Sequence, residues 1–115
     1  MIALRTLNVE ESFPSLEEAR FMVVDAIRRA KRDKVRILKI IHGYGSTGKG
    51  GTLNTGLRKS FALRKKEGVI KDYVIGERFN IFDNTTLALL DVAPDLAGDS
   101  DLGSTNEGVS FLWIQ

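Results

Sequence analysis

One segment organises the rest of the sequence: it reads Ile40-Ile41-His42-Gly43-Tyr44-Gly45-Ser46-Thr47-Gly48-Lys49-Gly50-Gly51-Thr52. The residues that lead into it, Val35 to Ile41, are mostly apolar and β-branched, which predicts a central strand buried on much of both faces. The residues that follow it, from about Thr52 to Lys66, place Leu53, Leu57 and Phe61 at helical spacing. The glycine-rich loop His42 to Gly51 therefore joins the end of a strand to the N-terminus of a helix.

Such a junction favours an anion, because unpaired backbone N–H groups and the positive end of the helix dipole face whatever lies there. Glycine lets the backbone approach a phosphate closely, and Lys49 adds a cation. Tyr44 either stacks on a base or covers the core. The predicted phosphate- or nucleic-acid-binding residues are His42, Gly43, Tyr44, Gly45, Ser46, Thr47, Gly48, Lys49, Gly50 and Gly51, followed along the helix by Arg58, Lys59 and Lys65.

The loop also resembles part of a nucleotide-binding motif. Gly43, Gly48 and Lys49 satisfy most of the G-x-x-x-x-G-K-[ST] pattern of nucleoside triphosphatases. Gly50, however, stands where that motif needs a magnesium-binding Ser or Thr. No apolar strand ends in a second, metal-holding Asp. The sequence therefore argues against ATP or GTP hydrolysis.

Further strands and helices flank this segment on both sides. Ser15 and Glu18 have the spacing of a capping box, Gly68 ends the second helix, and Asp83 caps a third. The predicted strands are Leu4 to Val9, Val35 to Ile41, Val69 to Ile75 and Val109 to Ile114, and the predicted helices are Leu16 to about Arg32, about Thr52 to Lys66, and Asn84 to about Val92. The order β-α-β-α-β-α-β predicts one α/β domain over residues 1–115. We expect a two-layer sandwich with the helices packed on a small mixed four-stranded sheet.

The composition is that of one small globular domain. The 115 residues are 43% hydrophobic and 28% charged, and no apolar run approaches the roughly 20 residues of a membrane-spanning helix. The chain has no cysteine, and its first residues lack the pattern of a secretory signal. We therefore expect a cytoplasmic domain with no membrane partner, and a monomer is favoured.

The net charge of +2 conceals an uneven distribution along the chain. Residues 1–78 hold all 17 Lys and Arg against nine acids, whereas residues 79–115 hold six acids and no Lys or Arg. The first part suits a polyanion, since clustered cations neutralise phosphates and release their counterions. The alternative is that these cations form solvated helix faces.

The glycine-rich segment and its neighbours resemble the Smr (small MutS-related) family. In that family a strand that ends in His-Gly-x-Gly precedes a helix that begins near Gly-x-Leu, and His42 to Gly45 and Gly51 to Leu53 match this pattern. Ser15 to Ala19 is similar to the family's first helix, and Gly108 to Leu112 to its closing strand. The resemblance covers most of the chain. It implies a nucleic-acid-binding domain with nicking or endonuclease activity.

The sequence departs from the family at the end of the first strand. Smr domains carry Leu-Asp-x-His-Gly there, a motif linked in the family to endonuclease activity, and the equivalent here is Leu7-Asn8-Val9-Glu10-Glu11. Because Asn8 is a poor base, the candidate catalytic residues are Glu10 and His42, the single histidine. The other interpretation of His42 is a hydrogen-bonding residue that braces the loop. We therefore expect cleavage to be absent or much slower than in family members that keep both residues.

The loop and the basic helix address phosphates, and few groups are placed for base edges, so we expect backbone- and structure-dependent binding of DNA or RNA. The alternative is a small enzyme or sensor that binds a phosphorylated metabolite at the same loop. No cofactor and no metal site is predicted, and Mg²⁺ or Mn²⁺ enters only if the domain is a nuclease. Asp99 and Asp101 begin like a calcium loop, but Ser110 takes the place of its closing Glu.

Overall fold

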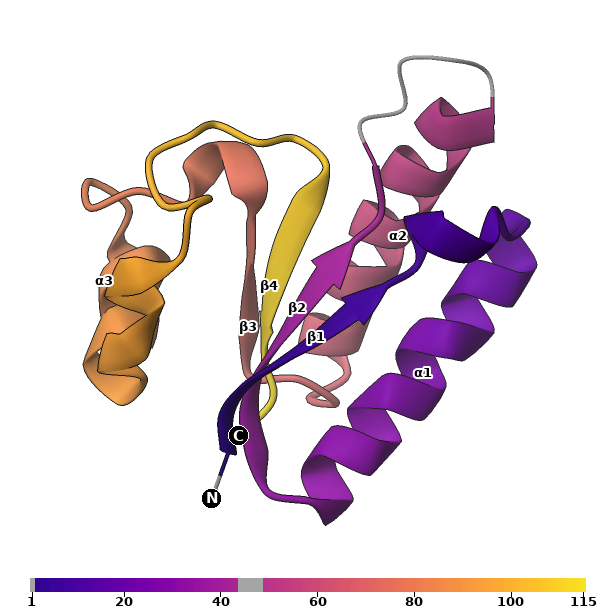
Figure 1. Ribbon diagram of the computed structural model, residues 1–115. Coiled ribbons are helices and arrows are strands. Elements are labelled where there is room, and N and C mark those ends of the chain that lie inside the picture. The colour runs from indigo at the N-terminus through magenta and orange to yellow at the C-terminus, as the bar shows by residue number, and fades with distance from the viewer. Residues whose placement is uncertain (1, 44–48) are drawn as a thin grey trace.

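A computed structural model describes residues 2–43 and 49–115, with only the backbone of residues 2 and 49–52 (Figure 1). Its strands are β1 (Ile2–Asn8), β2 (Val35–Ile41), β3 (Asp72–Ile75) and β4 (Val109–Trp113), and its helices are α1 (Leu16–Arg32), α2 (Lys49–Lys66) and α3 (Asn84–Val92). Three short 3-10 turns complete it, η1 (Glu10–Ser12), η2 (Gly76–Arg78) and η3 (Pro94–Gly98). The predicted order of strands and helices is confirmed.

The four strands form one mixed sheet in the order β1-β2-β4-β3. β1 and β2 are parallel, with Leu7 beside Ile40, and β4 is antiparallel to both β2 and β3. The carboxyl ends of β1, β2 and β3 therefore lie at one end of the sheet, together with the start of β4 (Figure 1). We call this the loop end, because the glycine-rich segment follows β2 there.

Helices α1 and α2 cover one face of the sheet (Figure 1). The predicted apolar stripe of α2 is confirmed, since Leu57 and Phe61 are buried with Val23 and Ile27 of α1 against β2. Gly56 allows the two helices to approach closely, because an added Cβ would lie 2.5 Å from the Leu16 side chain of α1. Ser15 and Glu18 form both hydrogen bonds of the predicted capping box.

Helix α3 and η3 cover part of the opposite face, where Leu89 and Leu96 are buried. There the rings of Phe79 and Phe111 stack with their centroids 4.0 Å apart. The predicted two-layer packing describes α1 and α2 on their face, and α3 adds a partial third layer. The physical reason is that β2 and β4 carry large apolar side chains on both faces, so each face needs a cover.

Lys39 lies on this second face and is only 9% exposed. Its Nζ is 3.0 Å from Oδ2 of Asp99 and 2.7 Å from Oδ2 of Asp101. Burial by itself would lower the pKa of Lys39, but the hydrogen bonds and charges of the two carboxylates outweigh this and raise it. The segment that begins like a calcium loop therefore supplies the counter-charges of a buried lysine.

Several element boundaries differ from the prediction. β3 begins at Asp72 and not at Val69, because Val69 and Ile70 turn into the core beneath α2 before the strand starts. α2 begins at Lys49, three residues before the predicted start at Thr52. β1 begins at Ile2 and ends at Asn8, and β4 ends at Trp113.

The turns after α1 and α2 both contain a residue in the left-handed conformation, but the residue type differs. Gly68 ends α2 as predicted and has a φ of +77°, the left-handed conformation that glycine adopts without strain. Lys34, directly after the C-cap of α1, has a φ of +59°. A side chain in that conformation costs about 1 kcal/mol. A lysine therefore stands where glycine would be more stable.

Candidate functional site

The loop end is held together by backbone hydrogen bonds on both sides of β2. Val9 N–H donates to the carbonyl of Ile41, and the N–H groups of His42 and Gly43 both donate to the carbonyl of Gly108, at 2.9 and 3.0 Å. The last described residues before the loop are thus fixed by the end of β1 and by the start of β4. The route of the chain into the glycine-rich segment is set by the sheet.

His42 is buried, with 1% of its surface exposed. Its Nδ1 lies 3.0 Å from the carbonyl oxygen of Gly43, and its Nε2 lies 2.9 Å from the hydroxyl of Ser110. A carbonyl only accepts, so Nδ1 carries the proton and Nε2 accepts from Ser110. Burial lowers the pKa of His42, although the bond to Gly43 partly opposes this. Both ring nitrogens of the neutral form are therefore engaged inside the protein.

Gly43 requires glycine on two counts. Its φ is +86°, and an added Cβ would lie 2.6 Å from Oε2 of Glu10. Residues with a side chain adopt that conformation only with strain, whereas glycine adopts it freely. The carbonyl of Gly43 also accepts from Nδ2 of Asn54 in α2, at 3.3 Å. Gly43 is therefore the point where the end of β2, η1 and α2 meet.

The two candidate catalytic residues both lie against Gly43. Glu10, in η1, is exposed and its carboxylate is packed against the Cα side of Gly43. His42 contacts the carbonyl of Gly43 from the interior. Asn8 lies beside Ile41 in the sheet, and its Oδ1 accepts from the N–H of Glu11 at 3.0 Å. The fold thus brings Asn8, Glu10 and His42 into one neighbourhood.

Arg58 is engaged within the protein. Its Nη2 donates to Oε1 of Glu77 at 2.6 Å and to the carbonyl of Glu107 at 3.2 Å. That same carbonyl accepts from Asn54. Desolvation alone would raise the pKa of Glu77, but the bond and charge of Arg58 lower it. Arg58 therefore fastens α2 to η2 and to the segment before β4.

The other predicted binding residues are dispersed. Lys59 is exposed on α2, and Lys65, at the far end of α2, lies 3.0 Å from Asp72. Lys49, Gly50 and Gly51, predicted as loop, belong to the first turn of α2, of which only the backbone is described. Tyr44, Gly45, Ser46, Thr47 and Gly48 lie outside the described residues. Lys65 is thus separated from the loop end by the length of the helix.

The sequence analysis did not identify several residues, later in the chain, that hold the site through hydrogen bonds. Ser110 binds His42, while Asn54 and Glu77 bind their partners from α2 and η2. Asn106 binds Asp101 through Nδ2 and accepts from the N–H of Gly108 through Oδ1, both at 2.8 Å. One signal was present in the sequence. Ser110 lies within an apolar predicted strand, and a hydroxyl that is buried there needs a hydrogen-bond partner.

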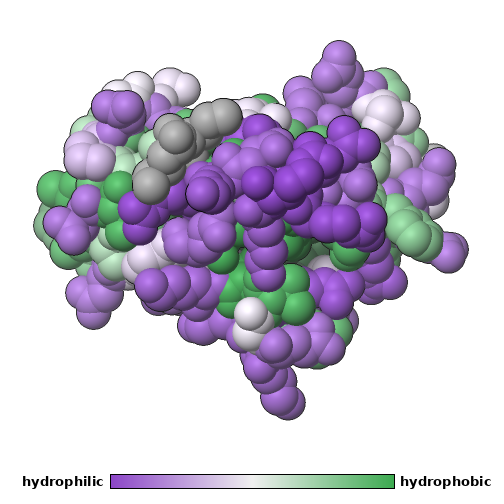
Figure 2. Space-filling model, turned by 90° about the horizontal axis from the view of Figure 1, so that it is seen from below, coloured by the Kyte–Doolittle hydropathy of each residue, from purple (hydrophilic) through white to green (hydrophobic). Residues whose placement is uncertain are grey.

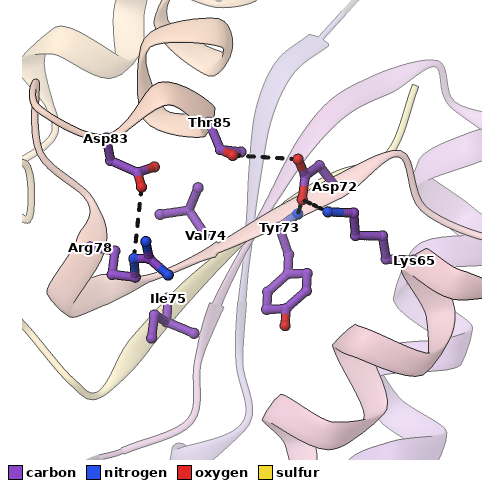
Figure 3. A pocket seen from close by; sticks show the side chains of 8 residues that line it. All are labelled: Lys65, Asp72, Tyr73, Val74, Ile75, Arg78, Asp83 and Thr85. Atoms are coloured by element: carbon purple, nitrogen blue, oxygen red, sulfur yellow. Dashed lines mark hydrogen bonds and ion pairs between the residues drawn. The ribbon is translucent and has the colours of Figure 1, made fainter.

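A cavity of about 230 Å³ lies elsewhere, along the outer edge of β3 (Figure 3). Lys65 and Thr85 reach Asp72 from opposite sides, and Asp72 also accepts from the N–H of Tyr73. The side chain of Asp72 thus occupies the backbone N–H of Tyr73, which hinders the use of that group by a further strand.

Two absences hold for the part of the chain that is described. No group of three or more His, Cys, Asp or Glu side chains there is arranged to hold a metal ion. No helix in that part is long and apolar enough to cross a membrane.

No protein-family model matches the chain, and no curated protein matches it. The fold does match a solved structure, the Smr domain of MutS2 from Thermus thermophilus, with a TM-score of 0.56. The match covers 99% of both chains at 16% sequence identity. The expected α/β fold with a mixed four-stranded sheet and the expected likeness to an Smr domain are therefore confirmed at the level of the fold.

Proposed function

We propose that this protein is an Smr-like nucleic-acid-binding domain that contacts the sugar-phosphate backbone at the loop end. One observation carries the proposal. Residues 41–43 are fixed by backbone hydrogen bonds and lead from β2 toward the N-terminus of α2, in a fold similar to that of an Smr domain. The first N–H groups of a helix have no intrahelical partner, and the helix dipole adds positive potential. Lys49, the first residue of α2, adds a cation to that terminus.

We further propose that cleavage is absent or slow. Acid–base cleavage of a phosphodiester needs one group to activate the nucleophile and another to protonate the leaving oxygen. His42 is neutral, buried and bonded through both nitrogens, so it suits a brace. Glu10 is exposed beside Gly43, but Asn8 stands where the family motif has Asp. One carboxylate then has to act without a second proton carrier.

Binding is tested by titrating a DNA duplex, a branched DNA and a single-stranded RNA at about 50 mM and about 200 mM salt. We expect all three to bind, with affinity that falls steeply with salt because counterions are released. Lys49→Ala weakens all three similarly, whereas Lys49→Arg, which keeps the charge, does not. No binding to nucleic acid, with salt-insensitive binding of a phosphorylated metabolite, would support the metabolite alternative.

Cleavage is tested with a labelled branched DNA and a structured RNA, with and without Mg²⁺ or Mn²⁺. The double substitution Asn8→Asp with Glu10→His restores the family motif, so it raises nicking while affinity changes little. Robust nicking by the unmodified protein that is lost in Glu10→Gln, with binding intact, would contradict the proposal.

A further inference from the structure

The end of the sheet opposite the loop end gathers cations from both helices, from the turns after them and from the start of β2. Residues 28–36 and 64–72 together contain ten Lys and Arg but only three acids. Ten is more than half of the 17 cations of the chain. We call these two segments the basic end. They comprise the last turns of α1 and α2, the turns after them, and the starts of β2 and β3.

Contacts with β1 and with the end of β4 hold these two segments in place. Asp33 lies 3.0 Å from Arg5 of β1, and the N–H of Ile114 donates to the carbonyl of Arg36 at 2.7 Å. Lys71 Nζ lies 4.5 Å from the ring centroid of Trp113. Figure 2 looks at the molecule from this side and shows a mainly hydrophilic surface. The basic end is thus one surface built from distant parts of the chain.

The three acids of this surface do not neutralise it. Asp33 pairs with Arg5 and Arg32, Glu67 with Arg64, and Asp72 with Lys65. Four other cations, Arg28, Lys31, Lys34 and Lys66, are exposed and form no ion pair with any described residue. A net excess of positive charge therefore faces solvent.

Support for the helix dipole explains only part of this arrangement. Cations in the last turns of α1 and α2 interact favourably with the negative helix ends. Lys34 and Lys71 lie outside both helices. Lys34 moreover adopts the left-handed conformation, with φ of +59°, in which glycine would be unstrained. A strained, exposed lysine within a basic surface points to a ligand for its charge.

We propose that the basic end is a second nucleic-acid-binding surface, which contacts the phosphodiester backbone independently of the loop end. This inference rests on the proposed nucleic-acid-binding function and adds a contact that the glycine-rich loop does not provide. The seven residues of β2 separate the two ends by about 23 Å at 3.3 Å per residue. One phosphate cannot bridge that distance, so the two surfaces contribute separately to affinity.

The test compares substitutions that remove exposed cations from different places. Lys34→Gly with Lys66→Gln removes two cations of the basic end, and Arg20→Gln removes one exposed cation of α1 as the control for Lys66→Gln alone. Binding of a DNA duplex and of a single-stranded RNA is measured at about 50 mM and about 200 mM salt. We expect the basic-end pair to lose about tenfold in affinity and to flatten the salt dependence. Lys66→Gln alone loses about threefold, whereas Arg20→Gln changes affinity less than about twofold.

The outcomes distinguish a failure of this inference from a failure of the proposed function. If nucleic acid binds and Lys49→Ala weakens it while the basic-end pair does not, the inference is wrong and the proposed function stands. If the unmodified protein binds neither nucleic acid, both fail. If it binds vesicles that contain phosphatidylserine through the basic-end cations, and nucleic acid does not compete, the surface is a membrane contact and the inference is wrong. An equal loss of affinity in Lys66→Gln and Arg20→Gln would also overturn it, since removing any exposed positive charge would then have the same effect.

Discussion

The loop end and the basic end use the same residue types in opposite ways. Arg58 at the loop end is partly buried and paired with Glu77, and Lys39 behind it is buried and held by two carboxylates. Lys34 and Lys66 at the basic end are exposed and form no ion pair with described residues. A buried partner is costly to remove, whereas an exposed charge adds little to stability. Charge at the loop end therefore shapes the protein, and charge at the basic end is available to a ligand.

The largest effect is expected when the buried ion pairs of Lys39 are removed. Lys39→Ala leaves Asp99 and Asp101 without their cation in a desolvated position, so we expect a loss of about 3 kcal/mol in the free energy of unfolding. Urea unfolding followed by circular dichroism measures it. The triple substitution Lys39→Met, Asp99→Asn and Asp101→Asn regains much of the loss. A loss below about 1 kcal/mol for Lys39→Ala would erase the contrast between the two regions.

A smaller loss is expected for Gly43→Ala, about 2 kcal/mol, because both its φ and Oε2 of Glu10 oppose a Cβ. Gly68→Ala is the matched control, since Gly68 also has a positive φ but no atom near an added Cβ. The difference between the two measures the contact with Glu10. Adding Glu10→Ala to Gly43→Ala recovers that difference. Equal losses would mean that the loop end is not tightly packed around Gly43.

His42 provides a pH test of the loop end. Because burial lowers its pKa in the folded protein, the unfolded chain takes up the proton first as pH falls. Stability is therefore full above the ordinary histidine pKa of 6.5 and decreases as pH falls from there toward the lowered pKa. The ring signals of this single histidine in NMR report both the titration and the tautomer with the proton on Nδ1. A titration at or above 6.5 would contradict the buried brace.

The smallest effect on stability is expected at the basic end. Lys34→Gly relieves the left-handed strain and so stabilises the fold by up to about 1 kcal/mol, while Lys66→Gln changes stability by less than about 0.5 kcal/mol. Thermal unfolding of each variant measures this. A clear loss in either variant would show that the basic end, like the loop end, uses its charges for stability.

Most of the fold follows from short-range patterns in the sequence. The period of the apolar residues and the caps predict α1, β2 and α3, because each depends on neighbours within a few residues. β3 is shorter than predicted, since Val69 and Ile70 meet the same apolar criterion as a strand but fill the core under α2. That choice is made by tertiary packing, which local pattern does not encode.

Only part of the candidate site could be predicted from the sequence, namely the residues around the glycine-rich segment. The turn His42-Gly43 and the neighbouring Glu10 follow from the junction of strand and helix and from the resemblance to a known family. The partners that hold them, Ser110 and Glu77, come from segments far along the chain, and only the sheet order brings them close. Likewise, spacing along α2 suggested that Arg58 is available to a ligand, but the ion pair with Glu77 depends on where η2 packs.

The position of β4 in the middle of the sheet has a consequence for how the chain assembles during synthesis. β4 is synthesised after the other three described strands, yet it lies between β2 and β3 and covers an edge of each. Until residues 109–113 emerge, β3 has no strand partner, and the apolar edge of β2 stays open to other chains. A chain whose synthesis has not reached residues 109–113 therefore lacks the strand that joins β3 to β2. We expect a stalled nascent chain that lacks these residues to be a target for chaperones.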